Sequence, residues 1–209
     1  YRTITGNQMG VLLLDYIITA RRESGTMPAN PAFIKTIVTT NMGREIAEKN
    51  GVHVDETFTG FKFMAEKLAE YKRDGSYEYI LAYEESYGYM MGDYVRDKDA
   101  VTASMMIAEM AAYYFSRGMT LADALDKLYE KYGWFEEKTL NLVMPGLDGL
   151  EKMKALMASL RANPPKEIGG TAVLGMRDYQ SGKIMLADIG VVGKTHISGS
   201  NVLYFELQD

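Results

Sequence analysis

The sequence predicts an α/β fold, a mixed and mostly parallel sheet with helices on both faces, followed by an incomplete α+β domain. Short runs rich in β-branched and aromatic residues alternate with longer helical patterns along residues 1–133. Helix-start signals and closing glycines recur between these runs. From residue 134 the pattern changes to strands around a single helix. We therefore expect one domain over residues 1–133 and the beginning of another over residues 134–209.

The first domain is expected to begin with a helix over residues 9–20, because Thr5 and Gln8 have the spacing of a capping box. Three strands are expected, at residues 34–39, 52–57 and 79–82. Two helices separate them, over about residues 43–50 and 59–73, each closed by a glycine. Ligands of such sheets bind beyond the carboxyl ends of the strands, so the segment after residue 83 becomes the first place to look.

The remaining elements follow from apolar runs and turn signals. Residues 100–116 are apolar nearly all round, which predicts a core helix, capped by Asp99. Further elements are a helix over 120–132, a strand over 138–144, a helix over 148–161, a strand pair over 171–179 and 183–187, and a strand over 201–208. The chain starts with Tyr and stops after a strand without a turn, so we expect a truncated fragment of a longer protein.

Composition limits the function classes. A net charge of −5 argues against a general nucleic-acid or membrane surface, so neither is an expected partner. The sequence has no apolar run of roughly 18 residues and no signal segment, and a cytoplasmic location is the expectation. The absence of cysteine excludes disulfides and thiolate metal sites, and His53 and His196 stand too far apart to indicate a zinc centre.

A polar loop directly follows the third expected strand. Glu84 and Glu85 offer carboxylate acceptors for the hydroxyls of a sugar, and Ser86 adds a donor and acceptor beside them. Further on, Arg96 and Lys98 precede an expected helix start, where free N–H groups and the helix dipole also attract anions. Acceptors for hydroxyls next to a seat for an anion predict a sugar phosphate as the ligand.

Each of these residues has an alternative interpretation. Glu84 and Glu85 could form an acid/base pair, although neighbours on an extended chain point to opposite faces. Residues 96–99 could be a solvated, internally paired charge cluster, or their two aspartates a metal site, which the intervening lysine argues against. A lysine in a first helical turn, such as Lys62, is either solvated or paired with an anion. Five tyrosines fit a sugar-stacking platform or ordinary packing equally well: Tyr79, Tyr83, Tyr87, Tyr89 and Tyr94.

The string EESYG at residues 84–88, followed by RDKD at residues 96–99, resembles the sugar-binding loop and basic segment of the α-D-phosphohexomutases, the phosphoglucomutase/phosphomannomutase family. The resemblance covers most of the chain and implies the third domain plus the start of the fourth. It also rests on TGNQMG at residues 5–10, KTIVTT at 35–40, TGFK at 59–62 and NVLYF at 201–205.

The resemblance implies roles for individual residues. Glu84 and Ser86 would contact the sugar hydroxyls, and Glu85 would be a variable position. Lys62 would line the active-site cleft, while Arg96 and Lys98 would add positive charge around the substrate. The EESYG form is similar to the phosphoglucomutase/phosphopentomutase-like branch, which favours glucose 1-phosphate and glucose 6-phosphate over mannose phosphates, with phosphomannomutase or phosphopentomutase specificity as the alternative.

The resemblance also implies what lies elsewhere. The family's nucleophile loop (TASHNP), metal loop (DGDxDR) and phosphate loop (RPSGTEP) are not found here, so this fragment would hold no catalytic or metal residue and be inactive alone. The full-length enzyme would use a phosphoserine, Mg²⁺ and a hexose 1,6-bisphosphate activator, and the partners of this chain would be its substrate and the missing domains. The competing hypotheses are a non-catalytic sugar-phosphate-binding module and a purely structural domain.

Overall fold

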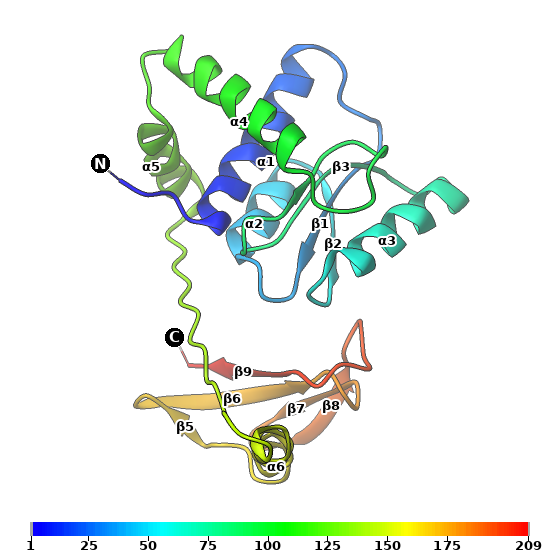
Figure 1. The fold of residues 1–209 in the computed structure, drawn as a ribbon, viewed down its shortest axis with the longest axis vertical. Helices are drawn as coiled ribbons and strands as arrows, with labels where there is room; N and C mark the ends of the chain where they lie inside the picture. The colour runs from blue at the N-terminus through cyan, green and yellow to red at the C-terminus, as the bar shows by residue number, and fades with distance from the viewer. Residues whose placement is uncertain (1, 209) are drawn as a thin grey trace. The chain divides into compact units, whose positions relative to one another are not determined.

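The computed structural model describes residues 2–208 and divides the chain into two compact units, Tyr1–Lys138 and Thr139–Asp209 (Figure 1). The helices of the first unit are α1 (Gly6–Glu23), α2 (Asn41–Lys49), α3 (Phe61–Asp74), α4 (Ala100–Phe115) and α5 (Leu121–Tyr132). Its strands are β1 (Pro31–Thr36), β2 (His53–Thr57), β3 (Glu78–Tyr83) and β4 (Tyr89–Met90). The division after Lys138 falls slightly beyond the expected one at residue 133.

The sheet of the first unit has the strand order β2-β1-β3-β4. Strand β1 runs parallel to both β2 and β3, while β4 returns antiparallel to β3. The expected mixed, mostly parallel sheet is therefore confirmed. The carboxyl ends of β1, β2 and β3 meet at one edge. The polar loop at residues 84–88, called the acidic loop below, begins at that edge because it directly follows β3.

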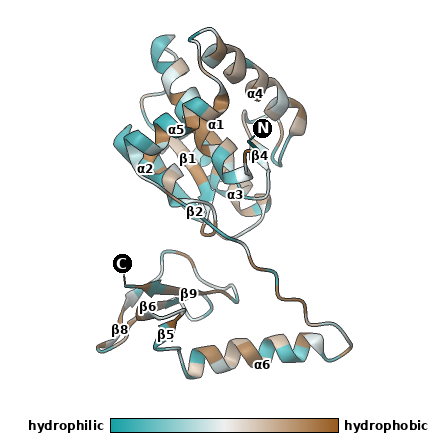
Figure 2. Cartoon of the chain, turned by 90° about the vertical axis from the view of Figure 1, so that its left-hand side faces the viewer, coloured by the Kyte–Doolittle hydropathy of each residue, from teal (hydrophilic) through white to brown (hydrophobic). Residues whose placement is uncertain are grey.

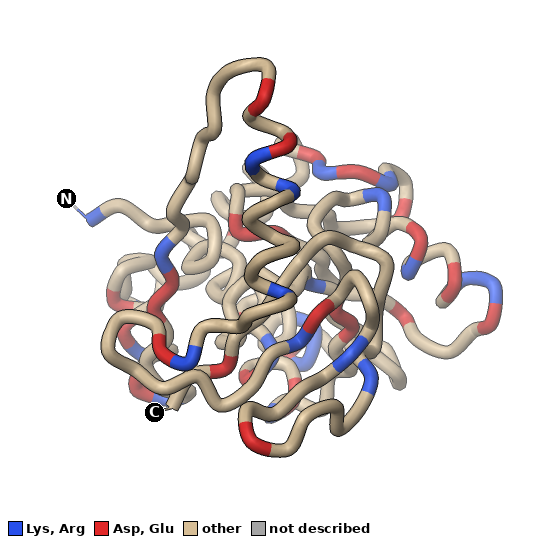
Figure 3. Tube along the Cα trace, turned by 90° about the horizontal axis from the view of Figure 1, so that it is seen from below, with Lys and Arg blue, Asp and Glu red and all other residues tan. Residues whose placement is uncertain are grey.

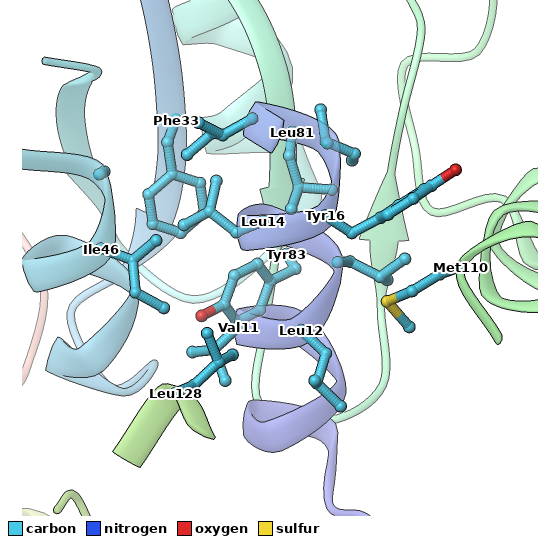
Figure 4. Packing of buried hydrophobic residues seen from close by; sticks show 14 of the residues in the cluster. Val11, Leu12, Leu14, Tyr16, Phe33, Ile46, Leu81, Tyr83, Met110 and Leu128 are labelled. Atoms are coloured by element: carbon cyan, nitrogen blue, oxygen red, sulfur yellow. The ribbon is translucent and has the colours of Figure 1, made fainter. Parts of the chain in front are cut away.

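Helices cover both faces of this sheet, as expected. On one face, residues such as Phe33 and Leu81 pack with α1, α2 and α5 in the larger hydrophobic cluster (Figure 4). On the other face, Ala32, Ile34 and Ala82 pack with α3. In β1, successive residues alternate between the two clusters, which is the period of two that a sheet buried on both faces requires.

The Tyr83 ring is wedged between the sheet and two helices. A side chain at Gly10 of α1 would clash with this ring, and one at Gly43 of α2 would lie 2.6 Å from the Tyr83 hydroxyl. The ring also stacks on Phe33 at 5.2 Å between centroids. Its hydroxyl is buried with no hydrogen-bond partner among residues 2–208, and burial raises the Tyr83 pKa well above its usual value.

The helix caps follow the sequence. Thr5 and Gln8 form the reciprocal capping box at the start of α1, and Thr120 does the same with Asp123 at α5. The Asp99 side chain accepts from the Val101 N–H and so caps α4. These local signals position helix starts because their hydrogen bonds join residues only a few positions apart.

The first strand lies earlier than expected, over Pro31–Thr36 instead of residues 34–39. The Thr36 and Thr39 hydroxyls are 2.8 Å apart, and each also accepts the backbone N–H of the other residue. Such local side-chain bonds compete with a strand ladder, so the β-branched run turns after Thr36. Pro31 is tolerated because it is the first residue of the strand.

The expectation that residues 100–116 form a core helix is wrong. The helix exists, as α4, but only Ala103, Met110 and Tyr114 are buried, whereas Val101 and Phe115 are largely exposed. Hydrophobicity alone indicated burial, but in the described part of the chain only one side of α4 has a surface to pack against. Figure 2 shows the pale and brown tones along this helix.

The second unit is an antiparallel sheet with one helix. Its elements are α6 (Gly149–Ala162), β5 (Glu167–Ile168), β6 (Thr171–Asp178), β7 (Lys183–Leu186), β8 (Gly190–Lys194) and β9 (Leu203–Leu207). The expected β6–β7 pair and last strand are confirmed, with β9 also pairing with β6. The strand expected over residues 138–144 is wrong, because these residues are extended without a strand partner, and Leu140, Leu142 and Val143 are exposed.

Charge and hydropathy on the described chain agree with the composition. Basic and acidic residues are interspersed along the trace (Figure 3). Among residues 2–208, no helix has both the length and the hydropathy that a membrane span needs.

The unpartnered Tyr83 hydroxyl generates a stability prediction. Tyr83→Phe should leave the free energy of unfolding unchanged or raise it by up to about 1 kcal/mol, because it removes a buried polar group without breaking a hydrogen bond. The matched control is Tyr89→Phe, whose hydroxyl donates to the Gly6 carbonyl at 3.0 Å, and which should lose about 1 kcal/mol. Urea unfolding measures both. A loss at Tyr83→Phe as large as the loss at Tyr89→Phe would contradict the prediction.

Candidate functional site

The acidic loop, residues 84–88, turns the chain from β3 to β4. The Glu84 N–H donates to the Gly88 carbonyl at 2.9 Å, which closes the loop on itself. Tyr87 adopts a φ of 65°, a conformation that non-glycine residues seldom take. Glu84 and Glu85 are half-buried, whereas Ser86 and Tyr87 are exposed. The loop is thus fixed at its base and open to solvent at its tip.

The start of α1 braces the acidic loop from one side. A side chain at Gly6 would collide with the Glu85 carbonyl, so backbone meets backbone at this point. The Tyr89 hydroxyl, at the beginning of β4, donates to the Gly6 carbonyl at 3.0 Å. The sequence achieves this close approach by placing glycine at the first position of the helix.

Phe61 connects the acidic loop with the basic segment. An atom at the Cβ position of Gly88 would lie 2.5 Å from the Phe61 ring and 2.6 Å from a Glu84 carboxylate oxygen. The Lys98 ammonium lies over the same ring, 5.3 Å from its centroid, in cation–π contact. Phe61 therefore packs beside Glu84 and contacts Lys98. A carboxylate acceptor and an ammonium cation thus lie near the same ring.

The other predicted basic residues are Lys62 and Arg96. The Lys62 ammonium lies over the neighbouring Phe63 ring at 4.6 Å, and the Lys62 side chain is exposed. Arg96 is also exposed. Their substrate-binding roles, like those of Glu84, Ser86 and Lys98, stay predictions.

Three helices begin against the acidic loop and its flanks. Gly6 starts α1 against the Glu85 carbonyl, and Phe61 starts α3 against Gly88. The N-cap of α4 is fixed to the sheet because the Asp99 N–H donates to the Tyr89 carbonyl at 3.0 Å. Helix starts present unpaired N–H groups and a positive dipole end, so this edge of the sheet attracts anions even beyond its lysines.

The two glutamates point to different neighbours. Glu84 lies by Gly88 and Phe61, whereas a Glu85 carboxylate oxygen accepts from the Thr39 hydroxyl at 3.5 Å. Next to Thr39, the Thr40 N–H donates to the Asn7 side chain at 3.1 Å. This divergence argues against a joint acid/base role, and it adds Thr39 and Asn7 to the edge. In the sequence, Thr39 stood out only as the last residue of an expected strand, and Asn7 only as a residue just after a helix cap.

Sequence reasoning also missed a buried ionic network at this edge. Lys35 of β1 is fully buried and donates to Glu56 at 2.8 Å and to Asn41 at 3.3 Å. Arg44 of α2 reaches the same Glu56 oxygen at 2.9 Å. The signal was a lysine inside a β-branched run, a residue that enters a core only when it is paired.

The charges of this network shift one another's pKa. Burial lowers the pKa of Lys35 from its usual 10.5, and the attraction of Glu56 opposes that shift without reversing it. Burial alone would raise the pKa of Glu56, but the charges and hydrogen bonds of Lys35 and Arg44 together outweigh it and hold the pKa below 4.5. The two shifts are coupled, because the same ion pair that lowers the pKa of Glu56 opposes the effect of burial on Lys35.

The described residues include no group of side chains placed as metal ligands. Within residues 2–208, no three or more His, Asp or Glu residues gather as metal ligands would. Of the two aspartates considered from sequence, Asp97 accepts the N–H of Lys98 at 2.7 Å, and Asp99 caps α4. Both have structural partners.

Comparison with known proteins identifies the fold of the first unit. Residues 5–132 match the family model described as phosphoglucomutase/phosphomannomutase, alpha/beta/alpha domain III. The chain belongs to this family. The match includes the acidic loop, Phe61 and the basic segment, so the candidate site lies inside the shared domain.

Sequence similarity to known proteins extends beyond the matched residues 5–132. A phosphoglucomutase of Staphylococcus aureus (strain bovine RF122 / ET3-1) is 34% identical over 198 residues, covering 95% of this chain and 35% of the relative. That of strain N315 matches with the same identity and coverage. The Paramecium phosphoprotein pp63/parafusin, a phosphoglucomutase in its open form, has 17% identity and a TM-score of 0.51, covering 95% of this chain and 33% of its own, a likeness of fold. This chain thus spans about a third of the length of these proteins.

The buried network generates a pH-dependent prediction. Glu56→Gln should lower the free energy of unfolding by about 3 kcal/mol near neutral pH, because it leaves the Lys35 charge buried without its ionic partner. The pKa of Lys35 is lower in the folded protein than in the unfolded chain, so a charged Lys35 lowers the stability of the folded state. This loss of stability is complete at pH values below the folded-state pKa. It is relieved as pH rises towards the unfolded value.

Urea unfolding at about pH 7 and about pH 9.5 measures this difference. The loss caused by Glu56→Gln should shrink at the higher pH. The matched control is Glu45→Gln, a partly exposed glutamate of α2 that pairs with Lys49 at the surface, and its small effect should not change with pH in this range. An equal loss for Glu56→Gln at both pH values would contradict the role assigned to Lys35.

Proposed function

We propose that this chain is the sugar-binding part of a longer phosphoglucomutase, which interconverts glucose 1-phosphate and glucose 6-phosphate. The proposal rests on one observation above the others: Phe61 joins the Glu84 carboxylate and the Lys98 ammonium at an edge where three helices start. The names of the S. aureus relatives, phosphoglucomutase, supply the reaction class.

The chemistry of a sugar phosphate matches the two halves of the site. A sugar ring presents hydroxyl donors, which carboxylates bind well, and Glu84 with Ser86 would take them. A phosphate presents oxygen acceptors and negative charge, which Lys98, Lys62 and Arg96 and the helix starts would balance. Holding the ring from its hydroxyls leaves either phosphate position free to face the reacting group.

The reaction would proceed by transfer of a phosphoryl group from a phosphoserine to one sugar oxygen. The bisphosphorylated sugar would then reorient in the site and return its other phosphoryl group to the serine. In this scheme the serine, Mg²⁺ and a hexose 1,6-bisphosphate activator belong to the full-length enzyme, where Mg²⁺ would neutralise charge during transfer. The residues of this chain bind and orient the sugar, and we expect the chain alone to be inactive and the enzyme to be cytoplasmic.

Glu84→Gln in the full-length enzyme is the direct test. It should lower kcat/KM for glucose 1-phosphate roughly 10–100-fold, because a hydrogen bond to a charged group is worth about 1.5–3 kcal/mol. The matched control is Glu78→Gln at the amino end of the same strand, whose exposed carboxylate lies at the opposite edge of the sheet. The control should keep wild-type kinetics, and unchanged kinetics in Glu84→Gln would remove Glu84 from the site.

A titration of the isolated chain tests binding separately from catalysis. Glucose 6-phosphate should shift the amide NMR signals of residues 84–88 and 96–99 more than glucose or inorganic phosphate does, because it alone offers both groups. A response in the chain together with an inactive full-length protein would favour the non-catalytic binding module. No response to any of the three ligands would favour the purely structural domain.

A further inference from the structure

Helix α4 has apolar side chains on two opposite sides. With 3.6 residues per turn, Ala103, Met110 and Tyr114 share one side, and these are its buried residues. Val101, Met105 and Phe115 lie on the opposite side and are 80%, 59% and 81% exposed. The helix is thus packed on its inner side and bare on its outer side.

The bare side has a regular pattern. Its residues, the outer stripe, are Val101, Met105, Ala108, Ala112 and Phe115, all exposed. Their spacing alternates between four and three positions, which is the pattern of a seam where one helix packs along another. The two alanines in the middle leave room for larger side chains of a partner.

The charge content of α4 separates it from an ordinary surface helix. Surface helices carry charged residues opposite their buried side, whereas Glu109 is the single charged residue between Ala100 and Phe115. Figure 2 shows the contrast with α2, which carries hydrophilic bands. Contiguous exposed apolar surface without charge marks a place where another protein surface binds.

We propose that the outer stripe is the docking surface for another domain of the same polypeptide, which packs an uncharged apolar helix along α4. This inference rests on the proposed function, in which the chain is part of a longer enzyme. The stripe runs for about 21 Å, or four helical turns, because each residue rises 1.5 Å. Lack of charge across such a length is typical of a permanent interface, since transient ones are more polar.

Two observations favour a domain of the same polypeptide over other occupants. The relatives that match 95% of this chain are about three times as long, so most of their sequence lies outside this match. The stripe also begins at Val101, immediately beyond the basic segment that carries Lys98. A domain seated on the stripe would therefore stand beside the candidate site, where the proposed reaction needs a nucleophile that this chain does not supply.

Methionine oxidation measures whether the stripe is covered. Met105 is exposed on the stripe, and Met110 on the same helix is buried and serves as an internal reference. Hydrogen peroxide oxidises methionine according to its exposure, so Met105 should react quickly in the isolated 209-residue chain. In the full-length protein, Met105 should react about tenfold more slowly at every protein concentration, as read by peptide mass spectrometry.

Two results would overturn the proposal. Equal Met105 rates in the chain and in the full-length protein would show that no other domain covers the stripe. Protection of Met105 in the isolated chain that increases with chain concentration would assign the stripe to a second copy of the chain instead. Because the readout is oxidation and not turnover, an inactive full-length protein with a protected Met105 would remove the proposed function and leave the docking surface standing.

A pair of variants at one position completes the test. Ala112→Glu puts a charge in the middle of the stripe and should restore rapid Met105 oxidation in the full-length protein. Ala112→Ser, small and uncharged, should keep Met105 protected. Both should leave the melting temperature of the isolated chain unchanged, because Ala112 is exposed there. Continued protection of Met105 in Ala112→Glu would also overturn the proposal.

Discussion

The close approach of α1 to β3 is the constraint on which the first unit depends. Gly10 lets the helix lie against the Tyr83 ring, and Gly6, one turn earlier, lets the helix start lie against the Glu85 carbonyl. Any side chain at either position would push the helix off the sheet. The same contact that closes the hydrophobic core therefore sets the height of the acidic loop above the sheet edge. Its cost is a Tyr83 hydroxyl that is buried without a partner among residues 2–208.

Electrostatics at the carboxyl edge of the sheet are arranged in two layers. In the lower layer, Glu56 pairs with both Lys35 and Arg44, and Arg44 also pairs with Glu48, so that the charges balance and β1, β2 and α2 are joined. In the exposed layer, helix starts and Lys98 supply positive charge around the carboxylates of the acidic loop. Pairing in the lower layer leaves the upper layer free to bind a ligand, because an unpaired charge beneath the site would compete for it.

In the proposed reaction, the role of this fold is to bind and orient the sugar. A loop fixed at its base by backbone contacts can orient a sugar ring, and orientation is a large part of what an enzyme contributes to phosphoryl transfer. The two apolar sides of α4 have different roles in the proposed assembly. One side fastens the helix to its own sheet, and the outer stripe is available to fasten the neighbouring domain close to the substrate.

Local patterns in the sequence were sufficient for much of this protein. The alternation of strands and helices, the capping boxes at Thr5 and Thr120, and the position of the acidic loop all depend on residues a few positions apart. The family could also be recognised from the sequence, because EESYG and RDKD are each unbroken strings of residues. Such features are determined by the sequence itself, since their hydrogen bonds and turns form between near neighbours.

Only the tertiary structure decided which surfaces meet. From apolar content alone, α4 was expected in the core and residues 138–144 in a strand. A buried helix needs a surface to pack against, and a strand needs a neighbouring strand. Neither partner is specified by the local sequence. The pairing of Lys35 with Glu56, the approach of Phe61 to Gly88 and the contact of Phe61 with Lys98 join residues 21 or more positions apart. These contacts exist because the sheet brings strand ends together at one edge, a consequence of the whole fold that no local pattern records.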